Sequence, residues 1–128
     1  MTYILSKRSK KRLSGLHEDL ISVVEEAIKI SDIDFTVLEG LRSKERQEQL
    51  FKSGASTTMR SRHLTGHAVD LGAYVNGGIR WDWPLYYKIA DAMKGEARNM
   101  GIELEWGGDW KTFKDGPHFQ LPFDNYPA

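Results

Sequence analysis

Hydrophobic residues near the N-terminus follow a helical spacing. They recur three or four positions apart, at Leu13, Leu16, Leu20, Val23, Ala27 and Ile30. This spacing places them along one face of an α-helix of about five turns, with that face towards the core. The pattern therefore predicts a single long helix across residues 13–30.

The next segment predicts a strand followed by a second helix. Residues 35–39 include two β-branched side chains, which is typical of a short strand. Ser43 can cap a helix, Glu45 suits the positive end of that helix, and Gly54 can end it. The small and polar residues at 55–62 predict a loop.

Alternation of side chains in the middle of the chain predicts a buried strand at residues 68–72. Val69 and Leu71 share one face of this strand, whereas Asp70 projects from the other face. The Asn-Gly-Gly sequence at 76–78 is a turn signal. We therefore expect a hairpin between Tyr74 and Arg80.

A third helix is predicted to begin near Pro84, which suits the first turn of a helix, with Asp82 or Trp83 preceding it as the cap. Its apolar face is formed by Leu85, Ile89, Met93 and Met100. Gly101 is expected to end this helix. The alternating apolar residues at 102–106 then predict a strand, which two glycines break.

Residues 118–121 predict the last strand. Phe119 and Leu121 are expected to face inward, with His118 and Gln120 on the opposite face. Helices and strands in this mixed order predict an α+β fold with a small, mainly antiparallel sheet flanked by helices. The 128 residues show no repeat or low-complexity linker, so we expect a single domain over residues 1–128.

Composition narrows the function classes. The 18 Lys and Arg residues balance the 18 Asp and Glu residues, so no overall charge favours nucleic acid or a membrane surface. A basic cluster at residues 7–12 has two interpretations: a solvated helix start, or a patch that attracts an anionic polymer. No stretch approaches the roughly 20 apolar residues of a membrane span, so stable membrane insertion is not expected.

Cysteine is absent, which excludes disulfides, thiolate zinc sites and a cysteine nucleophile. A metal site must therefore use histidine and carboxylate. His63, Asp70 and His118 are the candidates, because Gly66 permits a tight turn that brings His63 near Asp70. Catalytic zinc sites use three protein ligands and leave one position for water. The presence of two histidines and one carboxylate does not by itself distinguish a metal site from structural histidines.

His67 lies four residues after His63, as a second ligand on a helix would. The intervening Gly66 argues against a helix here, and the chain has no His-Glu-x-x-His motif. We therefore assign His67 to the rim of the site as a substrate contact, not to the metal.

Two motifs combine around these candidates. Ser61, His63 and Asp70 form Ser-x-His followed by Asp seven residues after the histidine, while Asp115 and His118 form Asp-x-x-His. Together they resemble the D-alanyl-D-alanine carboxypeptidase and dipeptidase family of the vancomycin-resistance type. The segments HLTGHAVDL at 63–71 and WGGDW at 106–110 are similar to its phage branch, the L-alanyl-D-glutamate endopeptidase endolysins. The resemblance spans residues 35–121.

This resemblance implies a zinc peptidase fold of the VanY and Hedgehog type. It implies one zinc ion on His63, Asp70 and His118, an acidic general base at Asp115 and an electrophilic Arg42. The carboxypeptidase and dipeptidase members usually have Glu where this chain has Asp115. Glu105 and Asp109 therefore remain alternative bases, although Gly116-Pro117 fixes the distance of Asp115 from His118.

Four further assignments each have an alternative. Arg42 either stabilises the negative charge that develops on a carbonyl oxygen or forms a surface salt bridge. Ser61 either orients a ligand or substrate or is an ordinary loop residue. Trp106 and Trp110 either wall a cleft for an extended peptide or belong to the core.

Three functions follow from these observations. The first is a monomeric endolysin that cuts peptidoglycan stem peptide at the L-alanyl-D-glutamate bond. It would stay in the host cytoplasm until another protein opens the membrane, and then reach the periplasm and wall. The first residues lack a signal peptide's apolar run, and no separate wall-binding domain is expected. The second function is a D-alanyl-D-alanine carboxypeptidase of wall metabolism. The third is a non-catalytic binding module, against which the intact ligands and base argue.

Overall fold

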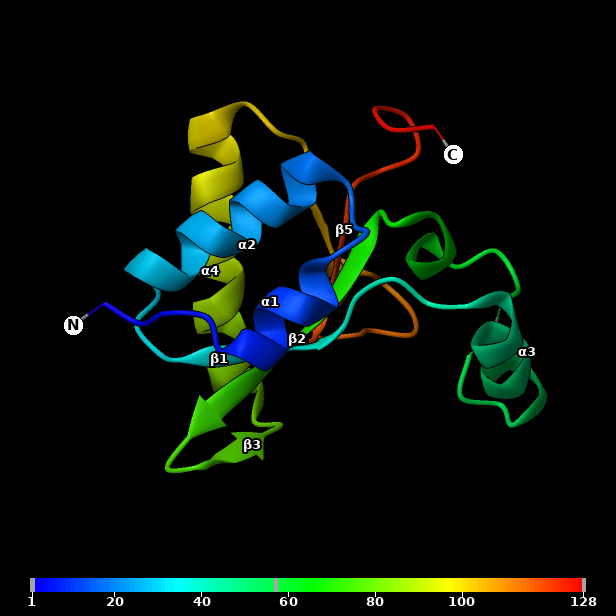
Figure 1. The fold of residues 1–128 in the computed structure, drawn as a ribbon, viewed down its shortest axis with the longest axis horizontal. Helices are drawn as coiled ribbons and strands as arrows, with labels where there is room; N and C mark the ends of the chain where they lie inside the picture. The colour runs from blue at the N-terminus through cyan, green and yellow to red at the C-terminus, as the bar shows by residue number, and fades with distance from the viewer. Residues whose placement is uncertain (1, 57, 128) are drawn as a thin grey trace.

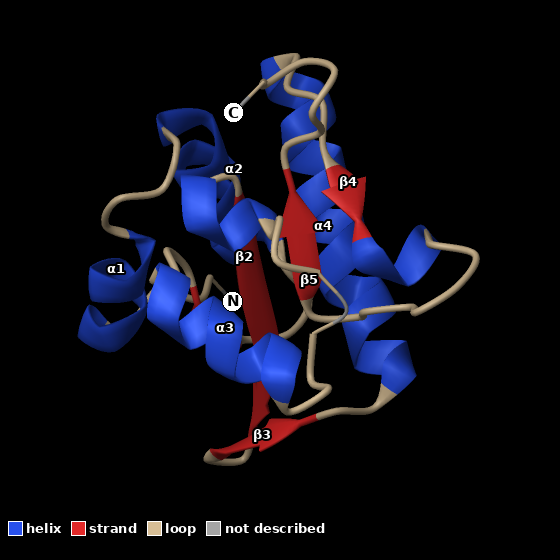
Figure 2. Ribbon diagram, turned by 90° about the vertical axis from the view of Figure 1, so that its right-hand side faces the viewer, coloured by secondary structure: helices blue, strands red, loops and turns tan. Residues whose placement is uncertain are grey.

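The computed structural model describes residues 2–56 and 58–127, and within them five strands form one sheet. The strands are β1 (Phe35–Glu39), β2 (Ala68–Val75), β3 (Gly78–Arg80), β4 (Glu105–Trp106) and β5 (His118–Gln120). Their order is β1-β2-β5-β4, with β3 paired to β2, and all these pairings are antiparallel. Figures 1 and 2 show β2 as the long central strand of this sheet. The predicted α+β fold with a mainly antiparallel sheet is confirmed.

The helices are α1 (Lys7–Leu13), α2 (Glu18–Ile30), α3 (Lys44–Lys52) and α4 (Trp83–Met100), with short 3₁₀ helices η1 (Arg62–Thr65) and η2 (Gly107–Asp109). α2 packs against α4, and both lie on the same side of the sheet (Figure 1). α3 lies away from this helical pair, on the other side of the molecule (Figure 1). None of the helices in the described part of the chain has the length and apolar character needed to span a membrane.

The two faces of the sheet have different roles. Val69 and Leu71 from β2, together with Phe119 and Leu121 from β5 and its continuation, are fully buried in the core. Because side chains alternate along a strand, Asp70 and His118 project from the opposite face. One sheet therefore supports a hydrophobic core on one side and a polar cluster on the other.

Local sequence signals predicted several boundaries correctly. Ser43 caps α3 by accepting a hydrogen bond from the Arg46 backbone N–H, and Gly101 ends α4 with φ of 71°. Asp82 is the N-cap of α4. The β2–β3 hairpin turns through Asn76 and Gly77, with φ of 52° and 82°, as the Asn-Gly signal requires.

The single helix predicted across residues 13–30 is wrong, because the chain breaks between α1 and α2. Gly15 has φ of +90°, and the His17 side chain caps α2 by accepting from the Asp19 backbone N–H. Leu13 and Leu16 are nevertheless buried, so residues flanking the break continue the apolar stripe.

The strand predicted at 102–106 is also shorter, and forms only at Glu105–Trp106. The Ile102 N–H instead bonds to the Ala97 carbonyl and closes the end of α4.

Candidate metal centre

Three chain segments bring His63, Asp70 and His118 together. Asp70 on β2 and His118 on β5 are directly opposite each other in the antiparallel register. His63 lies in η1, whose first turn is capped by Ser61 as its Oγ accepts from the His63 N–H at 3.2 Å. Gly66 then turns the chain into β2 with φ of 79°. A Cβ at Gly66 would lie 2.8 Å from a backbone oxygen, so glycine suits this turn sterically as well.

The side-chain atoms of this group converge on one carboxylate oxygen. His63 Nε2 lies 3.3 Å and His118 Nδ1 lies 3.2 Å from Asp70 Oδ1. One donor atom from each residue lies within 4.8 Å of the others. Within residues 2–56 and 58–127, no second group of three or more histidine or carboxylate side chains is arranged in this way.

The backbone and side-chain partners of the two histidines define which ring nitrogen faces Asp70. The Gly40 carbonyl lies 2.8 Å from His63 Nδ1. A carbonyl only accepts, so Nδ1 carries the proton and Nε2 keeps its lone pair. That buried Nε2 has no hydrogen-bond partner. Gln120 Oε1 lies 2.7 Å from His118 Nε2 and Asp70 Oδ1 lies 3.2 Å from His118 Nδ1, so each ring nitrogen faces an acceptor. When a cation binds between Nδ1 and Asp70, the proton on Nε2 stays bonded to Gln120 and Nδ1 offers its lone pair.

Three electron-pair donors therefore point at one another from a buried position. In neutral tautomers the two imidazole lone pairs and the Asp70 carboxylate would repel, and a divalent cation among them removes that repulsion. Two nitrogens and one oxygen are a donor set that zinc accepts, with a further position left for water. The residues present thus fit a metal site.

In the metal-free protein, protons on the histidine rings offset the negative charge of Asp70 in place of a metal cation. Burial alone would raise the pKa of Asp70, but its contacts with His118 and His63 outweigh burial and hold that pKa well below the usual carboxyl range. Burial lowers the pKa of His118, whereas its contacts with Asp70 more than offset that effect and raise it. Metal and protons therefore compete for the same atoms.

Arg42 is held beside this cluster by partners that the sequence did not single out. Its guanidinium donates two hydrogen bonds to Glu39, at 2.8 and 2.9 Å, and one to Gln47 Oε1 at 2.6 Å. Its NH2 lies 3.9 Å from Asp70 Oδ2. Hydrogen bonds from Arg42 hold the pKa of Glu39 below its usual range, so Glu39 is ionised at neutral pH.

Gln47 is fully buried and anchors Arg42 to the loop after α3. Its amide Nε2 donates to Ser56 Oγ at 2.9 Å and to the Thr58 carbonyl at 2.5 Å. Arg42 does form a salt bridge with Glu39, but its own side chain is only 9% exposed and is tied to the site. A glutamine in a polar helix gives no sequence signal for this role.

Asp115 lies in the same cleft, on a segment that the backbone fixes. Its N–H donates to the Gly107 carbonyl at 3.0 Å, and the His118 N–H donates to the Asp115 carbonyl at 3.2 Å. Burial raises the pKa of the Asp115 carboxyl above its usual range, and the charge on Asp70 raises it further. A carboxyl with a raised pKa suits proton transfer near neutral pH.

The two alternative bases lie elsewhere. Glu105 Oε2 accepts hydrogen bonds from Trp110 Nε1 at 3.0 Å and from Gln120 Nε2 at 2.9 Å. Asp109 is exposed and pairs with Lys94 at 2.6 Å. Neither side chain lines the cleft, whereas Asp115 does. The geometry favours Asp115 over both.

The remaining candidates separate into two groups. Ser61 and Trp110 line the cleft, and the Trp110 ring centroid lies 5.2 Å from that of His118. Trp106 is buried with 3% exposure and stacks on Phe119, so it belongs to the core and not to a cleft wall. Its Nε1 donates to the Gly116 carbonyl at 2.7 Å, which supports the segment that carries Asp115.

His67 is also placed away from the predicted site rim. Its ring packs against His17, with centroids 5.6 Å apart, and against Tyr126 at 6.4 Å. It does not line the cleft. The residue is therefore neither one of the converging donors nor placed to contact a substrate there.

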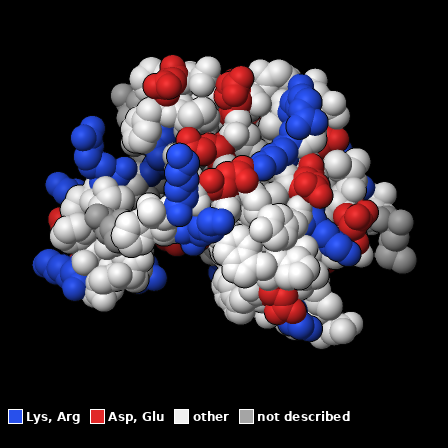
Figure 3. All heavy atoms as spheres, turned by 180° about the vertical axis from the view of Figure 1, so that it is seen from behind, with Lys and Arg blue, Asp and Glu red and all other residues white. Residues whose placement is uncertain are grey.

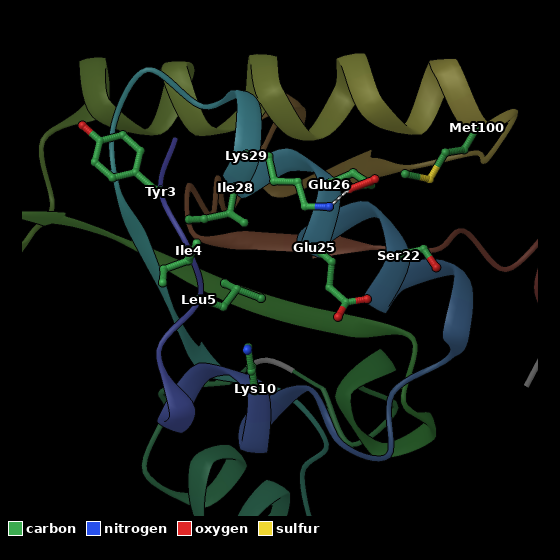
Figure 4. Close-up of a pocket in the computed structure, with 10 residues that line it drawn as sticks. All are labelled: Tyr3, Ile4, Leu5, Lys10, Ser22, Glu25, Glu26, Ile28, Lys29 and Met100. Atoms are coloured by element: carbon green, nitrogen blue, oxygen red, sulfur yellow. Dashed lines mark ion pairs between the residues drawn. The ribbon is translucent and has the colours of Figure 1, made fainter. Parts of the chain in front are cut away.

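The cleft has a volume of about 680 Å³ and runs from the loop after α3 to the segment before β5. On the face seen in Figure 3, basic and acidic side chains lie interspersed, in keeping with the zero net charge. A second hollow of about 570 Å³ lies by the N-terminal segment and α2 (Figure 4). It contains the Lys29–Glu26 ion pair at 2.7 Å but no histidine among its lining residues.

The fold is α+β, and it presents two histidines and one aspartate to the cleft. This combination defines a metallopeptidase-like class of site. The chain belongs to the phage L-alanyl-D-glutamate peptidase family, whose sequence model matches residues 1–121. The L-alanyl-D-glutamate peptidase of Escherichia phage T5 is 31% identical over 119 residues, covering 90% of this chain and 87% of the relative.

Solved structures agree with this membership. The L-Ala D-Glu endopeptidase ChiX of Serratia marcescens superposes with a TM-score of 0.93 at 52% identity, covering 98% of this chain and 95% of the other. The vancomycin-resistance D,D-dipeptidase VanXYg, solved with a D-Ala-D-Ala phosphinate analogue, has a TM-score of 0.54 at 23% identity. It covers 83% of this chain and 50% of its own length, and this likeness concerns the fold.

Proposed function

We propose that this chain is a zinc-dependent endopeptidase that hydrolyses the L-alanyl-D-glutamate bond of peptidoglycan stem peptide. The observation that carries the proposal is the convergence of His63 Nε2, Asp70 Oδ1 and His118 Nδ1 in a cleft that also holds a carboxyl of raised pKa. Membership of the phage peptidase family supports the choice of bond.

His63, Asp70 and His118 would hold the zinc ion. Bound there, zinc would polarise the scissile carbonyl and lower the pKa of water. The Gly40 carbonyl and the Gln120 side chain keep the ring nitrogens of the two histidines correctly protonated for this purpose. The contacts of Arg42 with Glu39 and Gln47 leave its position beside Asp70 fixed before substrate arrives.

Asp115 is the proposed general base. Its carboxylate takes a proton from the attacking water and passes it to the amine that leaves, which becomes the free amino group of D-glutamate. Arg42 is proposed to stabilise the negative charge on the carbonyl oxygen in the transition state. Ser61 holds η1 in place, and Trp110 provides an apolar wall for the peptide.

The biological setting is proposed from the family. The chain would act as a monomeric, single-domain phage endolysin during host lysis. It would remain in the host cytoplasm until the membrane is permeabilised and then act on the wall from the periplasm. Peptidoglycan is its proposed partner, and nucleic acid and stable membrane insertion have no role.

Mass analysis of digested peptidoglycan tests the bond specificity. Purified muropeptides treated with the wild-type protein should yield fragments with a new N-terminal D-glutamate and with terminal D-alanine retained. Asp115→Asn provides the inactive control. Release of free D-alanine as the only product would instead support a D-alanyl-D-alanine carboxypeptidase, and absence of any product from zinc-loaded protein would support a non-catalytic binding module.

A further inference from the structure

Behind His118, on the side away from His63, a line of hydrogen bonds runs through three further side chains. Trp110 Nε1 and Gln120 Nε2 both donate to Glu105 Oε2, at 3.0 and 2.9 Å. Gln120 Oε1 lies 2.7 Å from His118 Nε2. The antiparallel register places Glu105 directly opposite Gln120. The sheet therefore aligns these groups without help from a flexible loop.

The chemistry of each group gives this line a direction. An indole N–H only donates and an ionised carboxylate only accepts, whereas a glutamine amide has one end of each kind. Glu105 therefore binds the NH₂ end of Gln120 and turns its carbonyl end towards His118. A carbonyl oxygen there favours a proton on His118 Nε2, which in the neutral ring leaves a lone pair on Nδ1. Asp70 Oδ1, 3.2 Å from Nδ1, is the competing acceptor, so loss of the Gln120 acceptor shifts the ring towards the Nδ1-protonated tautomer.

Without Glu105, the Gln120 amide is free to rotate by half a turn. Its NH₂ group would then face His118 Nε2 and favour the tautomer with the proton on Nδ1. That tautomer presents a hydrogen, not a lone pair, to the metal position. Trp110 fills a further acceptor site of the same Glu105 oxygen and so limits the carboxylate's own rotation.

We propose that Glu105 and Gln120 are positioning residues that select the Nε2-protonated tautomer of His118 and so make its Nδ1 a metal ligand. This inference rests on the proposed function, because it takes His118 as a ligand. It assigns Glu105 a role different from that of a general base. Partners of metal-bound histidines typically change metal affinity by about 10–100-fold when they are replaced.

Two variants and a control test this proposal. Glu105→Leu removes the acceptor that orients Gln120. The double variant Glu105→Gln with Gln120→Glu exchanges amide and carboxylate, so that a carboxylate accepts directly from His118 Nε2 and the amide supports it. Asp109→Asn removes an exposed carboxylate from the same segment, which is bonded to Lys94 and not to this line.

Two measurements apply to each protein. Zinc affinity is measured by competition with a chromophoric chelator. The protonated ring nitrogen of His118 is identified from ¹⁵N-histidine NMR spectra of the metal-free protein, at a pH where the ring is neutral. Metal-free thermal unfolding reports whether each variant has folded.

Glu105→Leu should weaken zinc binding by about 10–100-fold and shift His118 towards a mixture of tautomers. The double exchange should restore both properties, and Asp109→Asn should change neither. Folded Glu105→Leu with wild-type zinc affinity and a wild-type His118 spectrum would overturn the proposal, as would a double exchange that fails to restore the tautomer. If the wild-type protein binds no zinc, the proposed function fails, while the difference between the His118 spectra of metal-free wild type and Glu105→Leu still decides whether this line selects the tautomer.

Discussion

Asp70 Oδ1 lies 3.2 Å from His118 Nδ1, across two strands whose backbones place these residues directly opposite each other. The pair is formed by the sheet itself and does not depend on loop conformation. His63 joins it from η1, which the Gly40 carbonyl and Ser61 hold in place. The three side chains are thus positioned by hydrogen-bonded backbone, and mutations in the site are expected to have separable consequences.

Purified wild-type protein should hold one zinc ion per chain, because three donor atoms lie within 4.8 Å of one another. Removal of zinc by a chelator should abolish peptidoglycan hydrolysis, and added zinc should restore it. His63→Ala should lose the metal. His67→Ala is the matched control, since His67 packs against His17 away from the cleft, and it should keep full zinc content. Full activity after complete metal removal would contradict the mechanism.

Asp115→Asn should lower turnover by about 10²–10⁴, the usual effect of losing a general acid–base group. Zinc content should stay at the wild-type level, because Asp115 is not among the converging donors. Asp109→Asn, which removes an exposed carboxylate nearby, should retain wild-type turnover. Loss of zinc in Asp115→Asn would show that the residue supports the metal and is not the base.

In the metal-free protein, the Asp115 carboxyl should titrate above the usual carboxyl range. Burial raises its pKa, and the charge on Asp70 raises it further. NMR titration of side-chain carboxyl groups in metal-free protein, with Asp115→Asn to assign the signal, measures this pKa. A value within the ordinary aspartate range would contradict the raised pKa.

The same shift predicts an effect on stability. An acid whose pKa is raised by folding stabilises the folded protein below its unfolded pKa, and this contribution is lost as the pH rises through the folded pKa. Once the pH exceeds that folded pKa, the partly buried Asp115 carboxylate therefore disfavours folding. Metal-free Asp115→Asn should unfold at a temperature no lower than wild type at neutral pH, and the difference should shrink in acid. A clearly lower unfolding temperature at neutral pH would contradict the raised pKa.

Arg42→Ala should lower turnover by about 10²–10³ if the guanidinium stabilises the developing oxyanion. It should also lower the free energy of unfolding by about 1–3 kcal/mol, because Glu39 and Gln47 lose their partner. Zinc content should stay intact. Arg42→Lys separates the two effects, since lysine keeps the charge but cannot bind Glu39 through two nitrogens. Unchanged turnover in folded Arg42→Ala would leave Arg42 a purely structural role.

Features controlled by neighbouring residues were predictable from the sequence. Ser43 as a cap, the Asn76-Gly77 turn and Gly101 as a helix end depend on local backbone chemistry, and the structure has all three. The break near Gly15 was not predicted, because buried leucines on both sides of it continue the helical spacing. Periodicity reports burial, and a buried turn satisfies it as well as a helix does.

The site residues, too, were predictable from the sequence only in part. The spacing of His63, Asp70 and His118 drew attention to residues that the structure brings together. The sequence left Trp106 open between cleft and core and placed His67 at the site rim. Tertiary packing, which the local sequence does not encode, puts Trp106 in the core and His67 against His17.

The roles of Gln47 and Gln120 were not predicted, although Gln120 was expected on the same face as His118, because these roles depend on distant hydrogen-bond partners. A glutamine carries no charge, periodicity or turn preference that reveals such a partner.

The register in which β5 pairs with β2 affects the metal site and the core at the same time. If β5 paired one residue out of step, His118 and Gln120 would turn into the core and Phe119 would face the cleft. Such a chain would lose both a metal ligand and a core side chain through a single register shift. Assembly of the candidate metal site is therefore coupled to correct packing of the core.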